Sequence, residues 1–573
     1  MRPQQDAAFA VFARRLIAGT LLILAAYHVL LTLSTASAYT LRYPFMDQFR
    51  FNLRYLTMPF PQSVLQLESG HRPILPGIVR VVELTRLGGM QTLQTVTAWL
   101  AAALAAAMLL REARRGLRGN ALLQAAAVCV IGTLLAWNAN VRMFIHPFEA
   151  VHVFYILFFV VAAAALALRA CARSLPRLWI VSIASCVAAT FTFGPGIASF
   201  AAPMSVAILR RQRLGTIALI GASAIATLFA YYLVLPGAAG LRGNVSASSA
   251  AVFFAVARLG AMYAEVVRLS VPELSMLVWI AWATGALAIA LTATTVVTRW
   301  MRRQNFSDLE TIGLAVFAFG FMANMLIAFG RTGYFFEYPG QLFAERYLFW
   351  SCVAWAGLIL YALARLADGR PASRYGAAAA VGVLSVCAIP SAVWANDWAG
   401  EVHRLSELTA VAERLTIRND ADLAAISDEG PMAAGLALDE MRRQRVAMFA
   451  ERPAMRLGDK VALAKPEAIL RGKMTNVTIS GNAGKTVRLL SGKLSEQLAS
   501  HAQSSELWLV GGDGTLIGRG AITYGLSPNR LRLGEPKWVG FQGYVLRSDS
   551  TGIVLAAVAD GVATPLARVE LRQ

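Results

Sequence analysis

A group of ionisable residues follows the first long apolar run of the chain, and its residue types suit chemistry on a phosphate and a hydroxyl. The run extends from Leu16 to Leu33, and the residues that follow it are Asp47, Arg50, Arg54, Glu68, His71 and Arg72. Ionisable side chains are expensive at a membrane, so such a group beside a spanning segment needs a reason. A solvated loop whose charges pair with one another would contain the same residue types.

The reaction that best fits these residues is glycosyl transfer to a hydroxyl. It needs a carboxylate that orients or deprotonates the acceptor, and cations that hold the departing phosphate. Asp47 is the candidate carboxylate. Arg50, Arg54 and Arg72 are candidate phosphate ligands, because a guanidinium can bind phosphate through two hydrogen bonds. His71 is a further candidate, although a His in such a loop is more often packed or solvated.

The composition is that of a multi-pass membrane protein. Of 573 residues, 57% are hydrophobic and only 15% are charged, which is too apolar for a soluble globular protein. The apolar runs predict eleven transmembrane helices, at 16–36, 90–110, 121–138, 150–169, 178–193, 195–209, 215–235, 274–298, 310–329, 347–365 and 376–395. The run at 195–209 is short enough to be re-entrant instead.

The distribution of arginine predicts that the N-terminus is cytoplasmic. Residues 1–396 contain 31 Arg, no Lys and 13 acidic residues, and 19 of these Arg fall in segments assigned to the cytoplasm. The other 12 lie on the outer side, where some would extend to headgroups and others suit an anionic lipid phosphate. Residues 397–573 have a net charge of only +2, so the overall +20 does not indicate nucleic-acid binding.

Two further outer segments carry candidate residues. The turn at 139–149 contains Arg142, and the loop at 330–346 contains Arg331, Glu345 and Arg346. These side chains would line the same cavity as the first loop. Alternatively, the turn is an ordinary polar connection, and Arg and Tyr at span ends anchor the protein at the interface.

The composition changes after residue 396. Residues 397–470 have helical periodicity, and residues 471–573 alternate short strands with Gly, Asn and Asp turns. We expect a membrane domain at 1–396 and a C-terminal α+β domain at 397–573 that ends in an antiparallel, sandwich-like β unit. The chain has five Cys, none of them after residue 396, and no Cys/His spacing typical of a metal site.

Several short motifs occur in a characteristic order within residues 10–396: Met46-Asp47-Gln48, His71-Arg72-Pro73, Phe193-Gly194-Pro195-Gly196, Gly330-Arg331 and Glu345-Arg346-Tyr347. With the many spans, they resemble the C-type glycosyltransferase (GT-C) superfamily of integral membrane enzymes, and more narrowly bacterial O-antigen glucosyltransferase-like proteins. The resemblance implies a polyprenyl-phosphate sugar donor, a site on the outer face, and Asp47 as the acceptor-activating carboxylate. Many members carry a second acid or a Trp beside this Asp, whereas Gln48 follows it here.

The sequence therefore predicts a GT-C-like polytopic helical protein of a bacterial inner membrane, with a periplasmic C-terminal domain. It would move a sugar from a polyprenyl-phosphate donor to a cell-envelope glycan, without a cofactor and without nucleic acid, and a divalent metal is left open. A lipid-linked glycan polymerase and a non-catalytic translocase or export component are the alternatives. The sequence does not identify the sugar, the acceptor, the linkage or the oligomeric state.

Overall fold

The computed structural model describes most of the chain, and the described residues are 2–68, 70–235, 249–450, 457–463, 466, 468, 469–478, 486–494, 498, 506–526, 536–546, 552–559 and 562–571. They divide into two compact units. The first unit comprises Met1–Ala36, Val64–Ile78 and Gln94–Ala395, and the second comprises Ser37–Ser63, Val79–Leu93 and Asn396–Gln573. The division after Ala395 lies next to the predicted boundary. The segments 37–63 and 79–93, which we assigned to the membrane domain, group with the C-terminal region.

The first unit is a bundle of apolar helices, as predicted. Within the described residues, ten helical stretches are long and apolar enough to span a membrane: Val11–Tyr39, Thr92–Gly116, Ala121–Ile145, Pro147–Arg173, Leu214–Val234, Ser249–Val267, Leu274–Met301, Asp308–Glu337, Glu345–Leu366 and Pro371–Arg414. The corresponding helices are α1 (Arg2–Tyr39), α5 (Thr92–Gly116), α6 (Ala121–Leu135) with α7 (Val141–Ile145), α8 (Pro147–Arg173), α11 (Leu214–Phe229) with η3 (Ala230–Val234), α12 (Ser249–Val267), α13 (Leu274–Met301), α14 (Asp308–Glu337), α15 (Glu345–Leu366), and α16 (Pro371–Cys387) with α17 (Ile389–Arg414).

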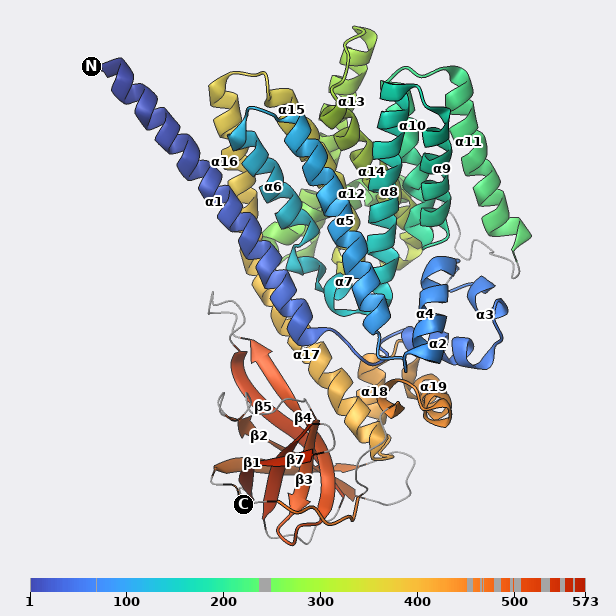
Figure 1. Ribbon diagram of the computed structural model, residues 1–573, viewed down its shortest axis with the longest axis vertical. Helices are drawn as coiled ribbons and strands as arrows, with labels where there is room; N and C mark the ends of the chain where they lie inside the picture. Colours follow the sequence, from blue (N-terminus) through green and yellow to red (C-terminus); the bar gives the residue numbers. More distant parts are fainter. Residues whose placement is uncertain are drawn as a thin grey trace. The chain divides into compact units, whose positions relative to one another are not determined.

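Two shorter apolar helical segments complete the bundle. They are α9 (Pro176–Thr190) and η2–α10 (Gly194–Phe200 and Ala201–Leu209), and they stand beside α8 (Figure 1). The chain turns back tightly between them, and the backbone at Gly196 comes so close to α9 that an added Cβ would lie only 1.8 Å from the carbonyl oxygen of Ala189. This close approach explains why glycine occupies position 196.

Helix α12 corrects one expectation. The predicted spans at 215–235 and 274–298 left residues 236–273 as a connecting segment, but α12 packs into the bundle against α13, α14 and α15. Glycines allow the contact: a Cβ at Gly260 would lie 1.9 Å from Ala281 O, and one at Gly285 would lie 2.0 Å from Val256 O. Small residues that let two backbones approach closely are typical of helix pairs in membranes.

The second unit contains short helices and a β-barrel. Its helices are α2 (Gln48–Thr57), half of the short α3 (Gln62–Leu65), the larger C-terminal parts of α4 (Ile74–Arg86) and α17, and all of α18 (Asp420–Ile426) and α19 (Gly430–Gln444). The strands are β1 (Ile469–Thr478), β2 (Thr486–Leu494), β3 (Glu506–Gly511), β4 (Leu516–Leu526), β5 (Pro536–Val545), β6 (Ile553–Ala559) and β7 (Val562–Leu571). They form a closed barrel in the order β1-β2-β5-β4-β3-β6-β7 (Figure 1), and not the sandwich-like unit that we expected.

The parallel pairing of β1 with β7 closes the barrel, and every other neighbouring pair is antiparallel. A ring of seven strands cannot alternate direction throughout, so one parallel pair is required. The interior is filled by side chains such as Leu490, Leu507, Leu509 and Leu555, all buried.

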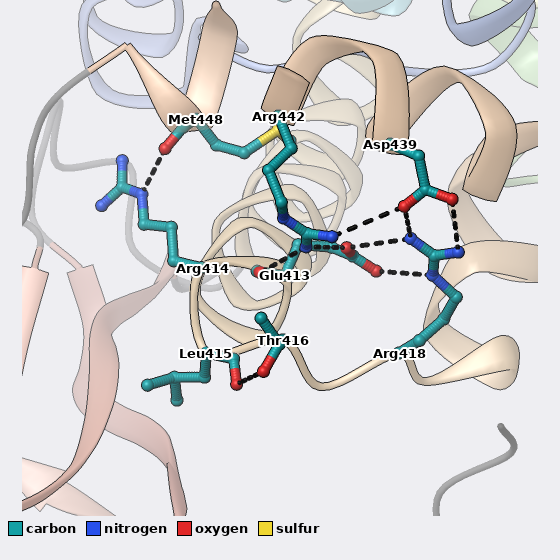
Figure 2. Close-up of polar contacts among 8 residues, drawn as sticks. All are labelled: Glu413, Arg414, Leu415, Thr416, Arg418, Asp439, Arg442 and Met448. Carbon is teal, nitrogen blue, oxygen red and sulfur yellow. Dashed lines mark hydrogen bonds and ion pairs between the residues drawn. The ribbon is translucent and has the colours of Figure 1, made fainter. Parts of the chain in front are cut away.

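An ion-pair network fixes the helices of the second unit. The carboxylate of Glu413, near the end of α17, is buried and accepts hydrogen bonds from Arg418 (3.3 Å) and Arg442 (2.9 Å), and Arg418 also donates to Asp439 of α19 at 2.7 Å (Figure 2). A buried carboxylate held by two guanidinium groups is compensated in charge. The network therefore stabilises the packing of α17 and α19 within the second unit.

Candidate functional site

The guanidinium of Arg72 is engaged in hydrogen bonds to the backbone. The side chain of Arg72 is fully buried, and its guanidinium donates to the carbonyl oxygens of Leu65 (3.0 Å), Tyr231 (2.5 Å) and Leu235 (3.0 Å). The backbone N–H of Arg72 also donates to the hydroxyl of Tyr231 at 2.9 Å. Two of these carbonyls lie at the end of the helix η3, where carbonyl groups lack helical partners. We expected Arg72 to bind phosphate, but its donors instead hold the loop against this helix end.

The turn that Arg72 holds presents His71 to the bundle. Glu68 and His71 form a backbone bridge, and Gly70 has a φ of +83° that glycine adopts without strain. The His71 ring lies against Phe193 at 4.5 Å between centroids. A Cβ at Gly194 would come within 2.5 Å of the imidazole, so the Phe193-Gly194 motif forms the surface on which His71 rests.

The imidazole of His71 is neutral at pH 7. Burial, with the positive charge of Arg331, lowers the pKa of His71 to about 4. A neutral imidazole can donate one hydrogen bond and accept another.

A row of rings extends from His71 into α8. Phe193 stacks on His152 at 4.3 Å, His152 meets Phe148 at 5.4 Å, and Phe148 stacks on His146 at 5.7 Å. Three of the six His of the chain lie in this row. The sequence suggested neither His152 nor Phe148 as a site residue, although their spacing of four residues places them on one helix face.

Arg142 is paired with Glu149 at the beginning of α8. The two side chains form an ion pair, and His146 Nδ1 lies 3.7 Å from the same carboxylate oxygen, Oε1. All three side chains are largely buried, and Arg346 lies within electrostatic range of Glu149. Arg142 and Arg346 thus both act on Glu149, and the charge of Arg142 is balanced by this carboxylate.

Arg331 and Arg346 meet at Tyr334, near the end of α14. Arg331 lies over the Tyr334 ring at 5.6 Å, and Arg346 donates to the Tyr334 hydroxyl at 3.3 Å and to Gln341 Oε1 at 3.2 Å. Arg331 has a non-helical backbone (φ −129°, ψ 16°), which marks a kink in α14. Its side chain is exposed, and within the described part of the chain no carboxylate lies at ion-pair distance from it. These features make Arg331 available to an anionic ligand.

Glu345 lies near another carboxylate. Its charge acts on Glu265 of α12, which is buried and forms an ion pair with Arg268 at 3.1 Å. In the first unit the structure therefore brings His71, Arg142, Arg331 and Arg346 together, and places Glu345 beside Glu265.

Asp47, Arg50 and Arg54 belong to the second unit. Arg50 forms an ion pair with Glu429 and lies 3.8 Å from Asp47, whose side chain is 40% exposed. Arg54 lies over the rings of Phe51 and Tyr55. Asp47 directly precedes α2 but makes no side-chain capping bond to it. The pairing that we considered as the alternative for this loop is therefore present for Arg50.

The described residues contain no group of three His, Cys, Asp or Glu that could hold a metal ion. Comparison with known proteins gives no identification, because no family model and no curated protein matches the chain. The interpretation of the site therefore depends on its residues alone.

The packing of His71 on Gly194 leads to a prediction. Gly194→Ala should displace the imidazole, because the added methyl would lie 2.5 Å from two of its ring atoms. We expect at least a tenfold loss of the glycosyl transfer that the sequence predicts. The melting temperature should stay within a few degrees of wild type, because a loop side chain can move at a cost of roughly 1–3 kcal/mol. Gly215→Ala, in α11, is the matched control, because no described atom lies within 4 Å of its added Cβ. Equal transfer activity of both variants would show that transfer does not depend on the position of the His71 imidazole.

Proposed function

We propose that the chain is a membrane glycosyltransferase that uses a polyprenyl-phosphate sugar as donor and a cell-envelope glycan as acceptor. The observation that carries the proposal is the exposed guanidinium of Arg331, which has no carboxylate partner among the described residues and lies one tyrosine ring from Arg346. Guanidinium groups in this arrangement suit a phosphate ester. The ten apolar helices support a substrate that is delivered from the lipid bilayer.

In this proposal Arg331 and Arg346 bind the phosphate, and neutral His71 offers a hydrogen bond to the substrate. The resemblance implies Asp47, in the second unit, as the acceptor-activating carboxylate, and this role is proposed separately from the residues of the first unit. Glu149 is held by Arg142 and His146. Arg72 has a structural role, for the reasons given above. The arginines in the segments assigned to the cytoplasm support a cytoplasmic N-terminus. The bacterial inner membrane and the periplasmic C-terminal domain are part of the proposal.

A translocase is the weaker alternative. Such a protein should carry ionisable residues along a passage through its spans. Arg258 and Glu265 do lie in the apolar helix α12, but both are buried and engaged, Arg258 with backbone carbonyls and Glu265 with Arg268.

The direct test is glycan profiling of cells that lack the gene and of cells complemented with wild type or Asp47→Asn. We expect deletion to remove one sugar from an envelope glycan, and Asp47→Asn to fail to restore it, because the amide cannot accept a proton from the acceptor hydroxyl. Unchanged glycans after deletion would refute the transferase. Shorter chains of unchanged composition would indicate a polymerase instead. Full rescue by Asp47→Asn would remove Asp47 from the site and leave the function standing.

A further inference from the structure

Arg258 is a fully buried cation in the apolar helix α12, and no carboxylate of the described chain lies at ion-pair distance from it. Its Nε is buried and has no hydrogen-bond partner among the described residues. A buried charge without an ionic partner is costly, most of all in an apolar bundle. The cost indicates that the guanidinium does something that a neutral side chain cannot do.

The guanidinium of Arg258 binds the segment that carries Arg346. It donates to the carbonyl oxygens of Leu342 and Tyr347 and, at 3.2 Å, to Asn324 Oδ1. Leu342 belongs to η4 (Pro339–Phe343), and Tyr347 belongs to the first turn of α15. The two carbonyls thus lie on either side of Arg346 in the sequence, and a single guanidinium fixes both.

The ring of Tyr347 connects the two arginines more directly. The guanidinium carbon of Arg258 lies 5.3 Å from the ring centroid, and that of Arg346 lies 5.0 Å from it. Cations are attracted to an aromatic face but repel each other. An anion bound at Arg346 would reduce this repulsion.

We propose that Arg258 is a positioning residue for Arg346, and that it holds Arg346 in the geometry that binds the phosphate of the lipid donor. The inference rests on the proposed function. Arg258 is fully buried, so it acts on the ligand only through the η4–α15 segment and the ring of Tyr347. Lysine cannot replace it, because an ammonium group lacks the planar fork that reaches two carbonyls at once.

The test measures binding of a short-chain polyprenyl phosphate to the full-length protein in nanodiscs, with the corresponding polyprenol as the uncharged probe. We expect Arg258→Lys to weaken binding of the phosphate by about tenfold and to leave binding of the polyprenol unchanged, as for loss of a charge-assisted contact. Arg299→Lys is the matched control. Arg299 is also a buried arginine, but it pairs with Glu310 at 2.6 Å and is remote in sequence from the η4–α15 segment.

The outcomes separate the inference from the function on which it rests. Wild-type affinity of Arg258→Lys, or an equal loss in Arg299→Lys, would overturn the positioning role. If the wild-type protein binds the polyprenyl phosphate no more tightly than the polyprenol, the proposed function itself is wrong. Should Arg258→Lys not accumulate in membranes, Asn324→Ala removes one of the three acceptors of Arg258, and we expect about threefold weaker binding. Unchanged binding by Asn324→Ala would then overturn the inference.

Discussion

Arg331→Ala should reduce transfer, and binding of a polyprenyl phosphate, by about 100-fold or more, since a pair of charge-assisted hydrogen bonds to phosphate contributes roughly 3 kcal/mol. The effect on stability should be small, because the side chain is exposed, lies over the ring of Tyr334 and forms no ion pair with the described residues. We expect the melting temperature in detergent to stay within about 2 °C of wild type. Binding and thermal unfolding are measured on the same preparation.

Two further variants make this prediction specific. Arg331→Lys keeps the charge but loses the planar fork, so its binding should be intermediate. Arg302→Ala removes another exposed arginine, at the end of α13, and should bind as wild type does. A loss of binding in Arg302→Ala as large as that in Arg331→Ala would mean that only net charge matters. Wild-type binding by Arg331→Ala would contradict the proposed phosphate site.

Much of the membrane unit could be predicted from the sequence, because long apolar runs have few alternatives to spanning helices. The packing of helix α12 in the bundle could not be predicted in this way. Its apolar and polar residues fit an interfacial helix as well as a packed one, and what decides between them is the contact of Gly260 with Ala281 and of Gly285 with Val256. Such contacts join separate helices and leave no periodic signal in either one.

The β-barrel could be predicted only in part. The strands β3 and β6 are short apolar runs within 471–573, where the sequence predicts strands. The strands β4 and β5 contain several glycines, which weaken the strand pattern but are needed where backbones approach: a Cβ at Gly518 would lie 2.1 Å from Tyr544 O. Closure depends on the pairing of Ile469 with Arg568, residues far apart in sequence.

The candidate site shows the same limit. Arg331 and Arg346 were predicted from their places at two span ends, which adjacent helices of a hairpin bring together. Arg258 lies between the spans predicted at 215–235 and 274–298, so the sequence did not distinguish it from an interface arginine. The role of Arg72 depends on Tyr231 and Leu235, which lie 159 and 163 residues further along the chain.

Arg72→Ala should therefore destabilise the protein strongly, even though Arg72 has the sequence context of a site residue. The substitution leaves the carbonyls of Leu65, Tyr231 and Leu235 without their donor in a buried environment, at a cost of about 3–5 kcal/mol in the free energy of unfolding. We expect a fall of several degrees in melting temperature and reduced accumulation in membranes.

The pair Arg72→Ala and Arg331→Ala distinguishes anchoring from ligand binding. Arg72→Lys should remain destabilised, because one ammonium group cannot reach three carbonyls that a guanidinium satisfies. The fraction of Arg72→Lys that folds should bind polyprenyl phosphate with an affinity within about threefold of wild type, since the guanidinium is consumed by backbone contacts. A stable Arg72→Lys protein with weak phosphate binding would instead restore Arg72 to the site. His71 is adjacent to Arg72, and we expect its contact with Phe193 to persist in the folded fraction of Arg72→Lys. The Gly194→Ala variant shows how much a displaced imidazole weakens phosphate binding.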